Sequence, residues 1–188
     1  MRCAVVLGGG PLSELIVGDL SGAHDLSVTL AQAVDLSDPA AVQALVAPFN
    51  VVVSAAPPSL GAATLRAVIA ANRLIADAST PVEQALSLED LAVEMEVAAC
   101  VVCGSQGLAR LLGKPGDGQL IDARIAALMA TALARRLLTG DFRGHWGVWT
   151  PERLATRVGM AHGILQDLRE RGIDVRGEAR YPRPSGSR

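Results

Sequence analysis

The amino-acid sequence predicts an α/β protein in which a parallel sheet carries helices on both faces and further helices follow at the C-terminal end. Three observations support this fold class. Short runs rich in Val and Ala alternate with amphipathic segments through the first hundred residues. Glycine or proline separates most of these runs, as is typical of tight turns. Half of the 188 residues are hydrophobic, which is enough for a buried core.

Five strands and the helices between them are expected in the first half. Residues 3–7 are apolar and run into three glycines, which predicts a buried strand and a turn. Pro11 suits the first position of a helix over residues 11–20. Asp38 and Pro39 have the residue types of an N-cap and a first helical position. The other expected strands are 26–31, 50–55, 74–77 and 97–103, and the other expected helices are 38–47, 60–72 and 81–96.

The last third of the chain reads as helical. Residues 120–139 form a long Ala-rich amphipathic stretch, and Thr150 with Pro151 predicts the start of another helix. A final helix is expected over residues 160–171. We therefore expect a sheet domain at 1–113, a helical extension at 119–175 that packs on it, and a disordered tail at 180–188.

Composition excludes several classes of partner. The formal net charge is −2, which provides no electrostatic footprint for nucleic acid or for a basic membrane-surface helix. No apolar run reaches the ~18 residues that span a bilayer. No group of His, Cys, Asp and Glu has the spacing of metal ligands, so no metal site is expected. These features predict a cytoplasmic protein that acts on a small molecule.

The three cysteines are Cys3, Cys100 and Cys103, an odd number that argues against a disulfide framework. Cys100 and Cys103 have the spacing of a redox pair, but they lie in an expected strand. Positions three apart in a strand face opposite sides. Small buried side chains are therefore the better interpretation, and Cys103, at the end of the strand, is kept as a candidate nucleophile.

The glycine-rich segment has the strand–turn–helix setting of a dinucleotide fingerprint. Its pattern is Gly8-x-Gly10-x-x-Ser13, in place of the usual three glycines. Gly8 would allow the tight turn and Gly10 the close approach of a pyrophosphate. Pro11 and Leu12 open the following helix, whose free N–H groups attract an anion. Backbone groups from Gly8 to Ser13 are thus candidate cofactor contacts.

Two features depart from a complete dinucleotide site. The acid expected at the tip of the second strand is missing, and Gln32 is the only nearby candidate for the ribose. In addition, one or two residues separate Ala31 from the strand-like pair Ala33 and Val34, although a parallel crossover needs a dozen or more. Either the second and third strands have merged or one has been lost. The sheet is therefore shortened after the second strand, and a wall for adenine is missing.

At this point several segments resemble the saccharopine dehydrogenase-like family of NAD(P)-dependent oxidoreductases. The resemblance implies a Rossmann-like domain that holds NAD(P) along residues 8–13 and along the turn of Ala55, Ala56 and Pro57. Members of the family carry a second, substrate-binding domain where this chain has only residues 113–118. The chain is thus similar to a reduced form without that domain, and the family's substrates are not carried over. The matching segments are 6–10, 34–39, 50–58, 75–79, 101–104, 107–109, 147–152 and 165–173.

Three side chains are candidate catalytic groups, each with a structural alternative. Asp77 ends a strand at the edge where ligands bind in open α/β sheets, but it could instead cap the turn that follows. Cys103 ends the next strand. His145 lies in a segment that holds Phe142 and both tryptophans, which could line an apolar pocket with His145 as general acid or base. Alternatively this segment is a hydrophobic clasp.

Three functions remain open from the sequence. The first is an NAD(P)-dependent small-molecule oxidoreductase. The second is a cofactor-independent enzyme of cyclase, isomerase or lyase type that reuses the dinucleotide cleft. The third is a non-catalytic partner subunit. A homodimer is expected in each case, because a small sheet domain without its usual insert gains from covering its exposed faces.

Overall fold

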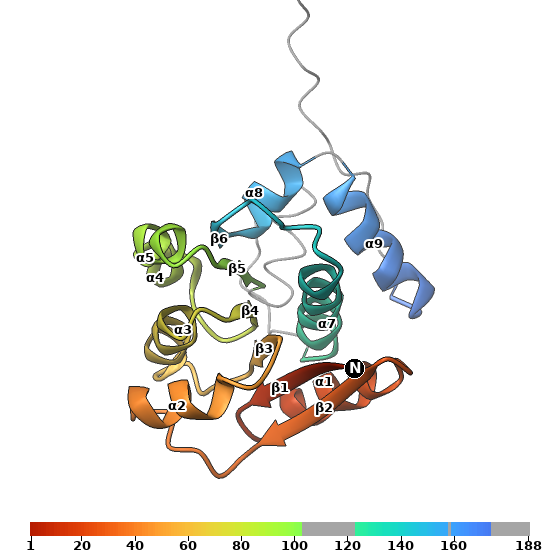
Figure 1. Ribbon diagram of the computed structural model, residues 1–188. Coiled ribbons are helices and arrows are strands. Elements are labelled where there is room, and N and C mark those ends of the chain that lie inside the picture. The colour runs from red at the N-terminus through yellow and green to blue at the C-terminus, as the bar shows by residue number, and fades with distance from the viewer. Residues whose placement is uncertain (103–122, 158, 174–188) are drawn as a thin grey trace, which may run out of the picture.

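The computed structural model, which describes residues 1–102, 123–157 and 159–173, confirms an all-parallel α/β fold of the Rossmann type with helices after it. Its sheet has six strands in the order β2-β1-β3-β4-β5-β6 (Figure 1). The strands are β1 (Arg2–Leu7), β2 (Leu26–Ala31), β3 (Val51–Ser54), β4 (Leu74–Asp77), β5 (Ala98–Val101) and β6 (Gly147–Trp149).

Helices cover both faces of this sheet, as the sequence predicted. One face packs against α1 and α7, and the other against α2 to α5. The described helices are α1 (Pro11–Ser21), α2 (Pro39–Val46), α3 (Gly61–Ala70), α4 (Val82–Leu86), α5 (Glu89–Glu94), α7 (Ala123–Thr139), α8 (Pro151–Thr156) and α9 (Met160–Glu170).

The central strand β3 shows how the two faces divide the core. Val51 and Val53 point into the cluster under α1 and α7, and Val52 points into the cluster under α3. All three are fully buried, as expected for a parallel strand covered on both sides. The alanines of α7 let this helix lie close to the sheet, so the C-terminal part of the chain shares one core with the first half.

The expected single helix over residues 81–96 is wrong, because the chain forms two short helices there. The break falls at Ser87 and Leu88. The hydroxyl of Ser87 donates to the carbonyl of Gln84 at 2.7 Å, a local bond that competes with helix continuation. Leu88 then turns into the core beside Ala85 and Ala92. Burial of Leu88 thus outweighs the regular helical pattern.

The segment after β2 decides between a merged and a lost strand. Ala33 and Val34 form no strand, and the chain runs without regular structure from Gln32 to Asp38. Asp38 caps α2 by accepting the N–H of Ala40 at 2.9 Å, as predicted. The described sheet therefore has no strand at the place of the usual third strand, and β2 is its edge strand.

The strand β6 was not predicted and closes the other edge of the sheet. It pairs in parallel with β5. Glu89 accepts the N–H of Val148 at 2.5 Å, and Arg153 donates to the carbonyl of Val148 at 2.9 Å. Arg153 also pairs with Glu89 at 2.8 Å. Gly147 has a φ of +110°, and a Cβ there would lie 2.6 Å from the Glu89 carboxylate, so another residue would be strained and would displace that side chain.

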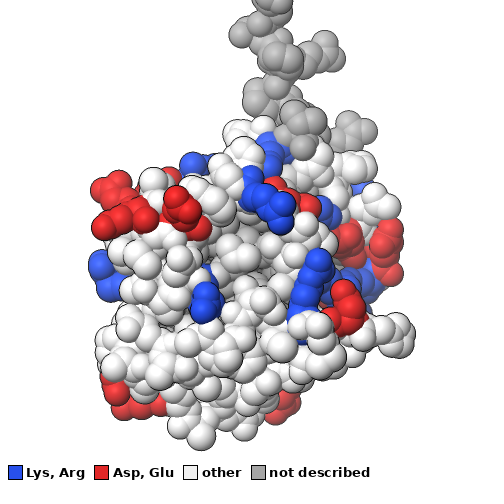
Figure 2. Space-filling model, in the orientation of Figure 1, with Lys and Arg blue, Asp and Glu red and all other residues white. Residues whose placement is uncertain are grey.

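Charged side chains are unevenly spread over the surface. Figure 2 shows acidic and basic groups around the upper half of one face, whereas the lower half, over β1, β2 and α2, shows few. β2 lies at the edge of the sheet. Charged side chains on an edge strand commonly prevent another strand from pairing with it, and this edge has few of them.

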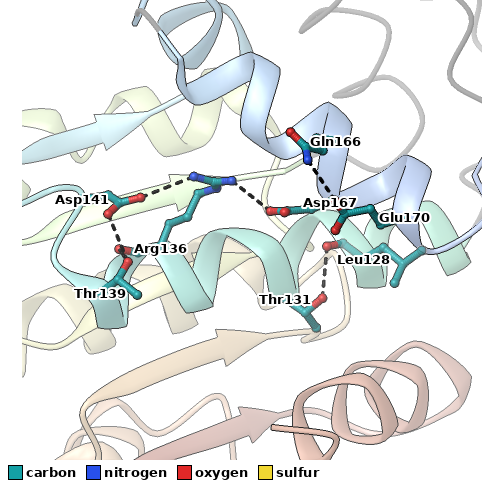
Figure 3. A network of polar contacts seen from close by, with 8 residues as sticks. All are labelled: Leu128, Thr131, Arg136, Thr139, Asp141, Gln166, Asp167 and Glu170. Carbon is teal, nitrogen blue, oxygen red and sulfur yellow. Dashed lines mark hydrogen bonds and ion pairs between the residues drawn. The ribbon is translucent and has the colours of Figure 1, made fainter.

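A polar network attaches α9 to α7 (Figure 3). Arg136 of α7 pairs with Asp167 of α9 at 3.0 Å and with Asp141 at 3.4 Å. Its guanidinium lies over Gly163, where a Cβ would come within 2.5 Å of a terminal nitrogen. Glycine at this position therefore lets the two helices approach around the arginine.

We predict that Glu89→Ala loosens β6. The substitution leaves the N–H of Val148 without its acceptor and Arg153 without its ion-pair partner. The free energy of unfolding should fall by about 1–3 kcal/mol, measured by urea denaturation. The control is Glu94→Ala, an exposed position on the same helix, which should change stability by less than about 0.5 kcal/mol. Equal effects of the two variants would contradict this role of Glu89.

Candidate functional site

The glycine turn begins where β1 and β3 approach most closely. Gly8 has a φ of +116°, and a Cβ built on it would lie 2.3 Å from the carbonyl oxygen of Ala55. The N–H of Ala55 donates to the carbonyl of Leu7 at 2.8 Å, which holds the two strand ends together. Gly8 is therefore required by packing within the protein, whether or not a ligand binds.

Gly9 and Gly10 face open space instead. Apart from the residues next to each glycine in the chain, no heavy atom of the described chain lies within 4 Å of a Cβ placed on either residue. Gly10, with a φ of +85°, is the N-cap of α1, and no side chain bonds to this end of the helix. Pro11 occupies the first helical position. The first turn therefore presents N–H groups without a side-chain cap, and anion binding at this end stays a prediction.

The next two residues of the fingerprint anchor α1 on the sheet. Leu12 is half-buried against the core, and Ser13 is fully buried. The hydroxyl of Ser13 has no hydrogen-bond partner in the described part of the chain. Ser13 thus fills the contact between helix and sheet that the third glycine makes in the usual pattern, at the cost of an unsatisfied polar atom.

The turn after β3 lies at the same edge of the sheet. Ala55 and Ala56 are buried, whereas Pro57 is exposed and accepts the N–H of Leu60 at 2.8 Å. Gln32 is exposed just beyond the tip of β2. Parallel strands end at one edge, so the residues assigned to a cofactor by sequence line the carboxyl edge of β2, β1 and β3 together.

Asp77 ends β4 at this edge, but its side chain turns inward. Its Oδ1 accepts the N–H of Ser79 at 3.0 Å and the hydroxyl of Ser79 at 2.5 Å, and its Oδ2 accepts the N–H of Thr80 at 3.1 Å. Ser54 meets the same serine hydroxyl at 3.1 Å. Asp77 is 0% exposed, and burial raises its pKa against the opposing effect of these hydrogen bonds. This geometry matches the capping alternative and couples the ends of β3 and β4.

The structure tests the prediction for Cys100 but not the prediction for Cys103. Cys100 is fully buried in β5, and burial raises the pKa of its thiol well above the usual range. It is therefore a small core side chain, as the sequence predicted. Cys103 lies outside the described residues, so its candidacy as a nucleophile stays a prediction.

His145 lies at the opposite edge of the sheet from Asp77 and Gly8. It comes immediately before β6, and parallel strands all begin at the amino edge. Its side chain is exposed, and its backbone carbonyl accepts the indole N–H of Trp149 at 3.1 Å. The structure thus does not bring His145 and Asp77 into one site. The sequence did not reveal this because β6, which fixes the direction of this segment, was not predicted.

A cavity of about 340 Å³ opens at this amino edge. The aromatic segment contributes Phe142 and Trp146, in agreement with the pocket interpretation, but His145 is not among the lining residues. Sequence reasoning missed the other walls of this cavity. They include Asn50 just before β3, Leu74 at the start of β4 and Leu137 near the end of α7.

The described ranges contain neither a candidate metal site nor a candidate membrane-spanning helix. No group of three or more His, Cys, Asp or Glu residues there could hold a metal ion. No helix in those ranges is both long enough and apolar enough to cross a membrane.

Comparison with known proteins gives likenesses in structure alone. No protein-family model matches the chain, and no curated protein sequence does. Saccharopine dehydrogenase (L-Glu forming) from Saccharomyces cerevisiae is similar with a TM-score of 0.54 and 18% identity, over 60% of this chain and 30% of that enzyme. This chain therefore matches less than a third of the length of that neighbour.

Two other solved structures are more distant. Dihydrodipicolinate reductase from Paenisporosarcina sp. TG-14, solved with dipicolinate, has a TM-score of 0.47 and 12% identity over 72% of this chain and 67% of that one. The WlbA dehydrogenase from Bordetella pertussis, solved with NADH and UDP-GlcNAcA, has a TM-score of 0.41 and 19% identity over 60% and 41%. These neighbours are oxidoreductases by name, and the likeness to saccharopine dehydrogenase shows a shared fold. The resemblance seen in sequence is thus supported at the level of the fold.

We predict opposite results for alanine at the two neighbouring glycines. Gly8→Ala forces a Cβ onto the Ala55 carbonyl at positive φ and should cost about 2–3 kcal/mol or more of unfolding free energy. Gly9→Ala meets no atom and should leave stability unchanged or raise it by about 0.5 kcal/mol. Urea denaturation measures both. Equal stability of the two variants would contradict the close approach of β1 and β3.

The raised pKa of Asp77 predicts a pH dependence with a defined sign. The native state binds this proton more tightly than the unfolded chain, whose aspartates have a pKa of about 3.9. The stabilising contribution is complete below that value and is lost as the pH rises through the native pKa. Measured in urea from about pH 4 to neutrality, wild-type unfolding free energy should fall relative to Asp77→Asn. Parallel pH profiles would contradict the prediction.

Proposed function

We propose that this chain binds a nicotinamide dinucleotide at the carboxyl edge of its sheet and acts as an oxidoreductase on a small molecule in the cytoplasm. The observation that carries the proposal is the pair Gly9 and Gly10, which leaves open space directly before the uncapped N-terminus of α1. That arrangement suits the close approach of a pyrophosphate to the backbone. The shared fold with saccharopine dehydrogenase supports it.

The residues present fit such a cofactor in part. The backbone of Gly9 and Gly10 and the first N–H groups of α1 would hold the pyrophosphate, and Ala55 to Pro57 would flank it. A bound nicotinamide would supply the acceptor or donor of a hydride. The chain's own contribution is to fix the backbone of this edge, through Gly8 beneath the turn and through the buried carboxylate of Asp77 beside it.

The adenosine end is less completely provided. Gln32 stands beyond the tip of β2, where the usual pattern has a carboxylate. A neutral amide can hydrogen-bond a ribose hydroxyl, and it does not repel a 2′-phosphate. The proposal therefore includes both NAD and NADP.

A second candidate function rests on the absence of a strand beyond β2 in the described sheet. Without that strand, the described residues provide no wall for adenine on that side of the sheet. The same edge would then hold another small molecule for a reaction without a redox cofactor, of cyclase, isomerase or lyase type. A non-catalytic partner subunit is the third candidate, since the matched part is 30% of saccharopine dehydrogenase and another chain could supply a substrate domain.

The deciding experiment is a titration with NADH, NADPH and their oxidised forms by calorimetry and thermal shift. A ligand at 100 times its Kd adds about 2.7 kcal/mol of stability. Gly9→Asp places a carboxylate at the pyrophosphate position without strain and should weaken binding about tenfold or more. Gly9→Asn, its uncharged match, should bind more tightly than the Asp variant.

The outcomes separate the candidates. Micromolar binding that Gly9→Asp weakens and Gly9→Asn retains supports the oxidoreductase. No binding of any of the four dinucleotides at millimolar concentration overturns it and favours a cofactor-independent use of the same edge. Binding that is equal in the two variants would place the dinucleotide elsewhere on the protein.

A further inference from the structure

The two edges of the sheet are treated differently. At β6, the outward N–H and carbonyl of Val148 are both occupied, by Glu89 and Arg153. An ion pair thus closes that edge to further strands. At β2, no described segment pairs with the outer side. Within the described residues, side chains close the edge at β6 and nothing pairs with the edge at β2.

The free edge has a regular backbone along its whole length. All six residues of β2 are in register with β1, without a bulge. The carbonyls of Asp25 and Ala31 face β1, where they accept the N–H groups of Arg2 and Gly8. Because directions alternate along a strand, the N–H and carbonyl groups of Val28 and Leu30 point outward. These four groups are available to another strand.

The side chains of β2 do not oppose pairing. Residues 26–31 contain no charged residue and no proline, which are the common devices that prevent strand addition. Thr29 is exposed, because α2 packs against α3 and does not cover β2. Figure 2 shows few charges on the face over this strand.

We propose that two copies of this chain associate through antiparallel pairing of β2 with β2, which gives one continuous sheet of twelve strands across a two-fold axis. Thr29 of one protomer lies on the axis, opposite Thr29 of the partner subunit. In this register Val28 exchanges two hydrogen bonds with the partner's Leu30, and Leu30 with the partner's Val28. The outward groups of both strands are then satisfied.

The register is self-complementary, which favours a second copy over a foreign strand. A two-fold axis places the same surface on both sides, so each residue must tolerate its opposite. Thr29 faces a threonine, which is a favourable cross-strand pair. Asp25, the charge nearest the strand, comes opposite the partner's Ala33, so no like charges meet. A strand of another protein would gain nothing from this symmetry.

The pairing has a consequence at the carboxyl edge, and this step rests on the proposed function. Antiparallel strands bring the beginning of the partner's β2 beside Gln32, where the lost third strand would stand. The second copy would thus provide the missing wall next to the adenosine end. Dimerisation is measured without any dinucleotide, so failure of the cofactor proposal leaves the test of pairing unaffected.

The first test is the oligomeric state by sedimentation equilibrium or light scattering over a concentration series. Wild type should be a dimer, and Thr29→Lys should be a monomer, because two like charges would meet on the axis. Thr29 is exposed in the single chain, so circular dichroism of the variant should be native. Ala63→Lys adds the same charge at an exposed position of α3 and should remain dimeric.

The second test fixes the register by crosslinking in a Cys3→Ser background. Directly opposite residues of a pair without hydrogen bonds have Cα atoms about 4.5 Å apart, within reach of a disulfide. Thr29→Cys should therefore form a covalent dimer under mild oxidation. Ala31→Cys lies two residues from the axis, about 14 Å from its own copy, and should not.

Three results would overturn the proposal. One is a wild-type monomer throughout the concentration series. Another is a dimer that Thr29→Lys leaves intact, which would place the interface elsewhere. The third is crosslinking of Ala31→Cys as fast as that of Thr29→Cys, which would exclude this register.

Discussion

The contact between the end of β1 and the carbonyl of Ala55 is the constraint on which the arrangement of this protein depends. β1 lies inside the sheet, between β2 and β3, so its direction and register constrain those of both neighbours. A Cβ at position 8 would lie 2.3 Å from the carbonyl oxygen of Ala55. Only glycine therefore allows the chain to leave β1 along this path. The turn through Gly9 and Gly10 and the start of α1 follow from that exit. The open N-terminal end of α1 thus follows from strand packing, whether or not a ligand binds there.

The common direction of the strands separates two chemical environments. The described part of the carboxyl edge presents mainly backbone, and the buried carboxylate of Asp77 is committed to the turn after β4. The amino edge holds a cavity lined by Phe142 and Trp146. The first edge therefore offers a ligand helix N–H groups and open backbone, and the second offers aromatic and polar side chains. His145 belongs to the second, because β6 runs parallel to the other strands.

The sequence predicted the elements whose signals are local and missed those that depend on distant contacts. Five strands and the caps at Asp38 and Thr150 followed from apolar runs and from residue types that act on the next few N–H groups. β6 has three residues and is held by Glu89, which lies 59 positions from Val148, so no local pattern indicated it. For Asp77, a role in capping and a role in catalysis would both require an aspartate at the carboxyl end of β4, so the sequence pattern is the same for both. Only burial against Ser54 and Ser79 distinguishes them.

The absence of a third strand from the described sheet links the proposed cofactor site to the uncovered edge at β2. In the usual order another strand lies outside β2, where it both covers that strand's outward backbone groups and walls the adenosine end. Here residues 32–38 lead directly to α2, so both consequences appear together. The other edge shows that the chain can close a strand with side chains, through Glu89 and Arg153. Among the described residues β2 has no such closure, and the proposed antiparallel partner strand would reach the same place beside Gln32 where the third strand is absent.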